Sequence, residues 1–254
     1  SATPDAVMAR RVRALGRLLR VGLHLAVGWW RIRTRFASLA QFQRDQEVQV
    51  WALEFLDHLA IKLIVLGEPP TSGPVLLAAN HISWLDIVVM HAARHCRFVS
   101  KDEVRRWPLV STLANSAGTL YLTRESRRDA LRVVHQMADC LRSGEVLAVF
   151  PEGTTGDGTT LLPFHANLLQ AAISADAPVQ PVALQFMDGA TGAISFAPCY
   201  VGDDTLVQSL WRTLCADNVR AVVQFGTPQR CEGRDRRTWA ADLRETIAGL
   251  RGHA

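Results

Sequence analysis

Apolar residues in this chain form short unbroken runs and longer periodic stretches, which together predict alternating strands and helices. Residues 75–79 and 146–150 are apolar at every position, as expected of strands buried on both faces. Residues 127–143 are amphipathic with helical spacing and end at Gly144. Further strands are expected at 97–100, 118–122, 178–186, 194–201 and 219–225, and further helices at 87–90, 166–175, 205–216 and 237–250. This order predicts an α/β fold with a mixed, mostly parallel sheet flanked by helices.

The N-terminal part has a different pattern. Eight arginines and no acidic residue lie between Met8 and Phe36, interleaved with leucine, valine and tryptophan. The longest stretch there without charge, 21–30, is far shorter than the ~20 residues that a spanning helix needs. The pattern therefore predicts an amphipathic helix on a membrane surface. An arginine-rich nucleic-acid arm fits the interleaved tryptophans less well, and a helix packed on the domain is the other alternative.

A second apolar stretch, residues 50–61, follows a polar segment and can pair with the first as an amphipathic helical hairpin. Glycines and prolines then interrupt the chain at 67–74. We therefore expect membrane-associating helices in residues 1–66 and an α/β domain in residues 67–254.

The first candidate chemistry follows the apolar run 75–79. His81 and Asp86 lie where a strand gives way to a helix, the position where α/β folds expose their chemistry. Ser83 and Asp86 have the spacing of a capping box, which predicts Ser83 at the N-cap and Asp86 in the first helical turn. In that arrangement His81 can act as a general base oriented by Asp86. The alternative is that Asp86 only caps the helix and His81 is an ordinary loop residue.

A second candidate segment follows the apolar run 146–150. Glu152, Gly153 and Thr154 begin a turn rich in glycine and threonine, a composition that suits an anion pocket lined by backbone N–H groups. The turn lacks the Gly-Lys-Ser/Thr of a P-loop. Taken alone, such a segment is more often an ordinary loop.

Together these segments resemble the glycerolipid acyltransferases, typified by 1-acylglycerol-3-phosphate acyltransferases. The resemblance covers residues 63–184 and rests on four blocks in the family's order and spacing. They are Asn80-His81-x4-Asp86, the segment Gly118 to Arg124, the segment Phe150 to Thr154, and the proline-containing strand at 178–184.

The resemblance implies transfer of an acyl chain from acyl-CoA or acyl carrier protein to a lysophospholipid hydroxyl, without a cofactor or metal. His81 would be the general base, Asp86 would orient it, and no acyl-enzyme would form. Glu152, Gly153 and Thr154 would contact substrate, and their backbone N–H groups are candidates for the oxyanion hole.

Arg124 suits an acceptor phosphate, because its planar guanidinium matches that group. Lys101 is a weaker candidate, and either cation can instead be a solvated surface charge.

Two departures from the family pattern concern the acceptor. Thr155 stands where arginine usually follows Glu-Gly-Thr, and His165 and Asn167 stand where lysine and glycine are common. Arg124 makes 1-acylglycerol-3-phosphate the leading acceptor, whereas Thr155 favours another lysolipid, such as one containing an amino acid. A non-enzymatic lipid-binding scaffold and a thioester hydrolase are the alternatives from other classes.

The remaining features limit location and chemistry. The five cysteines form no Cys-x-x-Cys pair, which favours free thiols in a reducing compartment. With the basic N-terminal segment, this predicts a peripheral protein on the cytoplasmic face of the inner membrane, without nucleic acid as a partner. His91 and His95 are four residues apart but lack a third metal ligand, which predicts a surface pair.

Overall fold

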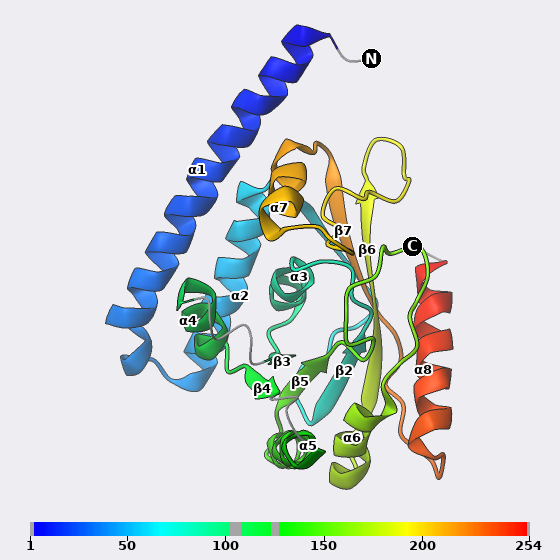
Figure 1. Cartoon of the computed structure of the whole chain (residues 1–254). Helices are drawn as coiled ribbons and strands as arrows, with labels where there is room; N and C mark the ends of the chain where they lie inside the picture. Colours follow the sequence, from blue (N-terminus) through cyan, green and yellow to red (C-terminus); the bar gives the residue numbers. More distant parts are fainter. Residues whose placement is uncertain (1–2, 102–107, 123–126, 253–254) are drawn as a thin grey trace.

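The computed structural model describes residues 3–101, 108–122 and 127–252. These residues contain a seven-stranded sheet with the strand order β1-β7-β6-β2-β5-β3-β4 (Figure 1). In chain order the strands are β1 (Lys62–Leu66), β2 (Val75–Ala79), β3 (Arg97–Lys101), β4 (Leu120–Leu122), β5 (Val146–Val149), β6 (Val179–Asp188) and β7 (Val219–Phe225).

The sheet is mixed and mostly parallel, as predicted. Neighbouring strands from β4 across to β6 all pair in parallel. Strand β7 pairs antiparallel with β6, and the edge strand β1 pairs in parallel with β7. The carboxyl ends of the neighbouring parallel strands β2 and β5 therefore lie side by side, which brings the two candidate segments together.

Helices cover both faces of this sheet (Figure 1). One face carries α1 (Pro4–Thr34), α2 (Gln41–His58), α3 (Asp86–Ala93) and α7 (Leu206–Cys215). The other carries α5 (Arg127–Arg142), α6 (Leu169–Ala175) and α8 (Arg236–Arg251). The short helix α4 (Pro108–Ser116) lies against α1.

Strand β2 is buried on both faces, which explains why its sequence is apolar throughout. Val75, Leu77 and Ala79 point into the core under α2 and α3, whereas Leu76 and Ala78 point into the core under α5 and α8. A central strand buried on both faces has no position that favours a polar side chain.

The predicted N-terminal hairpin is present. A turn containing the 3-10 helix η1 (Phe36–Ser38) joins α1 to α2, and α1 also packs against α7. In Figure 1, α1 runs along one side of the molecule and its N-terminal end extends past the other helices. No helix in the described part of the chain is long and apolar enough to cross a membrane.

The domain boundary at residue 67 stays a prediction. On the N-terminal side of that boundary, β1 is already a strand of the sheet, and Phe55, Leu56 and Leu59 belong to the core under α2. The hairpin and the sheet thus share one buried surface.

Two expected elements differ from the structure, and two observed elements were not expected. Residues 194–201 form no strand, and only Ile194 makes an isolated bridge, to Met187. The expected helix at 166–175 opens with the 3-10 helix η3 (Ala166–Leu168) before α6. Strand β1 and helix α4 were not expected, because their short segments carry no clear periodicity.

Candidate active site

The turn after β2 has the predicted form, with one difference at the helix start. Helix α3 begins at Asp86 with Leu85 as its N-cap, so Ser83 is not the N-cap. The Ser83 hydroxyl instead accepts from the N–H of Leu85 at 3.1 Å and donates to the carbonyl of Pro198. Asp86 still occupies the first helical turn, where a carboxylate is favoured by the N-terminal end of the helix dipole.

The Asp86 carboxylate holds this turn together. Its Oδ2 accepts from the N–H groups of Ile82 at 2.6 Å and Ser83 at 2.9 Å. The same oxygen lies 2.8 Å from Nδ1 of His81. Asp86 is fully buried, whereas the His81 side chain is 19% exposed. A donating Nδ1–H places the imidazole in the tautomer whose Nε2 can accept a proton.

Glu152 connects the second segment to the first. Its Oε1 accepts from the N–H of His81 at 2.7 Å, and its Oε2 accepts from the N–H of Leu162 at 2.7 Å. Burial raises the pKa of this carboxyl, and the two backbone donors oppose that rise. Both oxygens are thus committed to backbone groups, so the carboxylate positions the His81 turn.

The turn after Glu152 is tight. Gly153 has a φ of 70°, a conformation that favours glycine, and its N–H donates to the carbonyl of Phe150 at 3.0 Å. Thr154 is exposed. The N–H of Gly153 is therefore already used within the turn, and the N–H of Thr154 is the better oxyanion donor to test.

The two predicted cations are not placed at the site. Arg124 lies outside the described residues. Lys101 is the last residue of β3, and its side chain is outside the described part of the structure. Their roles as phosphate ligands stay predictions.

Two residues of the motifs have contacts that the sequence did not indicate. The buried side chain of Asn80 bonds Leu184 twice, donating to its carbonyl at 3.0 Å and accepting from its N–H at 2.7 Å. This amide fastens the end of β2 to β6. The ring of Phe150 stacks on His81 with centroids 4.0 Å apart. Both residues were visible as motif positions, but their partners are distant in sequence.

A loop before α7 closes over the two motif turns. The N–H of Tyr200 donates to the carbonyl of Ile82 at 3.2 Å, and the Thr155 hydroxyl donates to the carbonyl of Tyr200. Thr155, the residue that replaces the family's usual arginine, therefore binds the loop.

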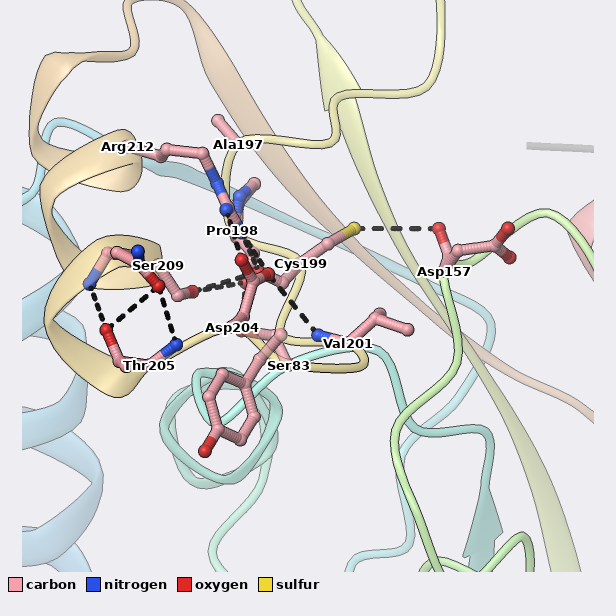
Figure 2. A network of polar contacts seen from close by, with 12 residues as sticks. Ser83, Asp157, Ala197, Pro198, Cys199, Val201, Asp204, Thr205, Ser209 and Arg212 are labelled. Atoms are coloured by element: carbon pink, nitrogen blue, oxygen red, sulfur yellow. Dashed lines mark hydrogen bonds and ion pairs between the residues drawn. The ribbon is translucent and has the colours of Figure 1, made fainter.

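Polar contacts hold this loop against α7 (Figure 2). Arg212 of α7 donates to both oxygens of Asp204, at 2.8 and 2.7 Å, and to the carbonyl of Cys199. The Ser209 hydroxyl also donates to Cys199, at 2.9 Å. Side chains also donate to the carbonyls of Ala197, Pro198 and Tyr200. Because these carbonyls have hydrogen-bond donors, this part of the loop needs no strand partner.

The prediction of a surface pair at His91 and His95 is wrong. Both side chains are buried between α2 and α3, and their rings stack 5.1 Å apart. Burial lowers the pKa of His91 to about 3. The described residues contain no group of three or more His, Cys, Asp or Glu side chains suited to a metal.

Residues 60–185 match the family model described as Acyltransferase. The lyso-ornithine lipid O-acyltransferase of Pseudomonas aeruginosa is 37% identical over 243 residues, covering 95% of this chain and 92% of that protein. The chain belongs to the acyltransferase family. It is an acyltransferase enzyme, as its motifs indicated.

Other relatives of this acyltransferase carry a second name. The 1-acyl-sn-glycerol-3-phosphate acyltransferase of Neisseria gonorrhoeae is 37% identical over 188 residues, 73% of each chain. The crystal structure of the 1-acyl-sn-glycerophosphate acyltransferase PlsC from Thermotoga maritima has the same fold, with a TM-score of 0.71. It is 19% identical and covers 96% of this chain and 97% of that one. The fold class inferred from the sequence is therefore confirmed.

Proposed function

We propose that this acyltransferase moves a fatty acyl chain from a thioester to the hydroxyl of a lysolipid. The hydroxyl gives its proton to His81 as its oxygen attacks the thioester carbonyl. Collapse of the tetrahedral intermediate forms the ester and expels a thiolate, which takes the proton back from His81. Acyl-CoA and acyl carrier protein both supply such a thioester.

The contact between His81 and Asp86 is the observation that carries this proposal. The 2.8 Å separation from Nδ1 to Oδ2 orients the ring and stabilises the imidazolium that forms during attack. Because the His81 side chain is partly exposed, a substrate can reach the ring. General base catalysis of this kind contributes about 10²–10⁴-fold to the rate. An alcohol nucleophile from the substrate makes an enzyme nucleophile unnecessary.

For the acceptor we propose a lysolipid with an amino-acid headgroup, such as lyso-ornithine lipid. The relative that matches almost the whole chain carries that name. In addition, the residue after Glu152-Gly153-Thr154 is Thr155, whose neutral hydroxyl is occupied by the carbonyl of Tyr200. A phosphate monoester is best bound by guanidinium groups, and this position supplies none.

The second candidate acceptor is 1-acylglycerol-3-phosphate. The neisserial relatives carry the corresponding name. Arg124, which the resemblance assigns to the acceptor phosphate, supports this candidate from sequence alone.

We further propose that α1 binds the membrane surface, on the cytoplasmic face of the inner membrane. Its large apolar residues Leu15, Leu19 and Leu23 are exposed, Leu19 to 75%. At about 100° per residue these positions lie on the side of α1 opposite the buried Ala14 and Val21. A helix with one face on the domain and an apolar opposite face suits the interface of a bilayer.

An acyl-transfer assay tests the proposal. The full chain is incubated with long-chain acyl-CoA or acyl carrier protein, and thiol release is followed with lyso-ornithine lipid, with 1-acylglycerol-3-phosphate, and without acceptor. We expect thiol release that requires a lysolipid and is fastest with lyso-ornithine lipid. Equal release without acceptor would identify a thioester hydrolase, and no release under any condition would favour a scaffold.

A further inference from the structure

The ring of Phe150 lies flat against the imidazole of His81. Their centroids are 4.0 Å apart and their planes differ by 7°. Phe150 directly follows β5 and His81 follows β2 by two residues, and these strands are hydrogen-bonded neighbours in parallel register. The sheet itself therefore fixes the distance between the two rings.

A second ring supports Phe150 from behind. Phe98 of β3 stacks on it at 5.4 Å with planes 21° apart, and Phe98 is buried. His91 in turn meets Phe98 edge to face at 5.1 Å. Because burial lowers the pKa of His91 to about 3, the ring that meets Phe98 is neutral near pH 7.

We infer that Phe150 is a positioning residue that fixes the plane of the His81 imidazole and stabilises its protonated form. This inference rests on the proposed role of His81 as general base. The hydrogen bond to Asp86 fixes the position of Nδ1, and contact with the face of Phe150 limits tilting of the ring plane.

The charge of the imidazole changes during the reaction, so the stack also contributes to the rate. The face of an aromatic ring attracts a cation more strongly than a neutral group. His81 is neutral before attack and becomes an imidazolium as the hydroxyl proton arrives. An interaction that strengthens only in the transition state raises kcat and leaves substrate binding unchanged.

Fluorinated phenylalanine tests this without changing the shape of the residue. Replacing Phe150 with trifluorophenylalanine weakens the negative face of the ring and keeps its stacking geometry. We expect kcat to fall about three- to thirtyfold, the effect of losing a partly desolvated cation–π contact, with KM unchanged. The same fluorinated residue in place of Phe225, a buried phenylalanine on β7, is the matched control and should leave kcat unchanged.

Two natural substitutions complete the series. Phe150→Leu removes the aromatic face and should lower kcat at least as much as fluorination, whereas Phe150→Tyr keeps the face and should retain kcat within about twofold. Proton NMR of His81 gives a readout independent of turnover. The Phe150 ring current should shift the His81 carbon-bound protons upfield in the wild type and not in Phe150→Leu.

The results distinguish this inference from the proposed function. An active wild type whose fluorinated variant keeps full kcat would overturn the inference, and so would a rise in KM alone. If Phe150→Leu does not fold, the fluorinated and tyrosine variants still decide the question. An inactive wild type with the predicted ring-current shift would overturn the proposed function, and the NMR result would confirm only the stack.

Discussion

The turns around His81 and the outer face of α1 depart from ordinary burial in opposite ways. Around His81, the polar side chains of Asp86, Glu152 and Asn80 are buried. On α1, the large apolar side chains of Leu19 and Leu23 are exposed. Polar side chains are usually outside and large apolar ones inside, so both regions are exceptions that point to function.

The two regions differ in whether contacts within the chain stabilise these side chains. The buried carboxylates of Asp86 and Glu152 both accept from backbone N–H groups, and Oδ1 of Asp86 is left without a hydrogen-bond partner among the described residues. The exposed leucines of α1 are not covered by other described parts of the fold. Contacts within the chain therefore position the His81 turn, whereas the exposed face of α1 is the surface that we propose binds the membrane.

The largest expected effect comes from weakening the polar cluster. Asp86→Asn should lower kcat by about 10²–10⁴-fold, because the amide no longer stabilises an imidazolium or favours the correct tautomer. Measurement of kcat and KM for purified wild type and variant checks this. Glu145→Gln, at a partly exposed ion pair with Arg97, is a control that should keep most of the activity. Full activity of Asp86→Asn would mean that the carboxylate has only a structural role.

The next effect concerns the apolar face. Leu19→Gln together with Leu23→Gln should weaken binding to phospholipid vesicles by at least about 100-fold, since burying each of the two leucines contributes roughly 1.5–3 kcal/mol. Co-sedimentation with vesicles measures this, and thermal unfolding should be unchanged because both residues are exposed. The control is Leu131→Gln, an exposed leucine on α5 that should not affect binding. Undiminished vesicle binding by the double variant would exclude α1 as the contact.

A smaller effect is expected at Glu152. Glu152→Gln replaces one acceptor oxygen by an N–H₂ group, which cannot accept from His81 or Leu162, and should reduce the free energy of unfolding by about 1–3 kcal/mol. Urea denaturation measures this change. Unchanged stability would mean that the two backbone contacts are dispensable.

The difference in unfolding free energy between wild type and Glu152→Gln should depend on pH, because the pKa of Glu152 is raised in the folded protein. Burial raises the pKa of Glu152 above the ordinary glutamate value of 4.5, so the folded protein binds this proton more tightly than the unfolded chain. The stability of the wild type relative to Glu152→Gln should therefore be greatest below pH 4.5. It should decline as the pH rises through the folded-state pKa. A difference that grows with pH would contradict this assignment.

The smallest expected effect is on acceptor choice. Thr155→Arg should raise the ratio of activity with 1-acylglycerol-3-phosphate to activity with lyso-ornithine lipid by about tenfold, the discrimination available from one charge-assisted contact. Competition assays with both acceptors measure the ratio. Thr155→Val removes only the bond to Tyr200 and should leave the ratio unchanged. If both variants shift the ratio equally, the loop and not the charge controls selection.

Most of the sheet was predictable from the sequence, and so was the contact between His81 and Asp86, whose catalytic roles stay predictions. Residues 75–79 and 146–149 were recognisable because strands buried on both faces are apolar at every position. His81 and Asp86 were recognisable because a short motif fixes both residues within one turn. Residues 194–201 misled, since their apolar positions resemble a strand while Ser83, Ser209 and Arg212 bind the carbonyls of that segment or its flank.

The partners of Glu152 and Phe150 could not be predicted. The Glu152 contact with His81 joins residues 71 positions apart, and the Phe150 stack depends on the register between β2 and β5. Neither leaves a local pattern in the sequence. The burial of His91 and His95 was missed for the same reason, because it depends on how α2 packs on α3.

The proposed role of His81 as general base is tested most directly by the rate of acyl transfer in the His81→Ala variant. The assay uses saturating acyl-CoA and lyso-ornithine lipid, with circular dichroism and thermal unfolding to verify the fold. We propose that His81 takes the proton of the attacking hydroxyl, so we expect kcat to fall by about 10²–10⁴-fold with little change in KM. A correctly folded His81→Ala protein that transfers the acyl chain at the wild-type rate would contradict this proposal.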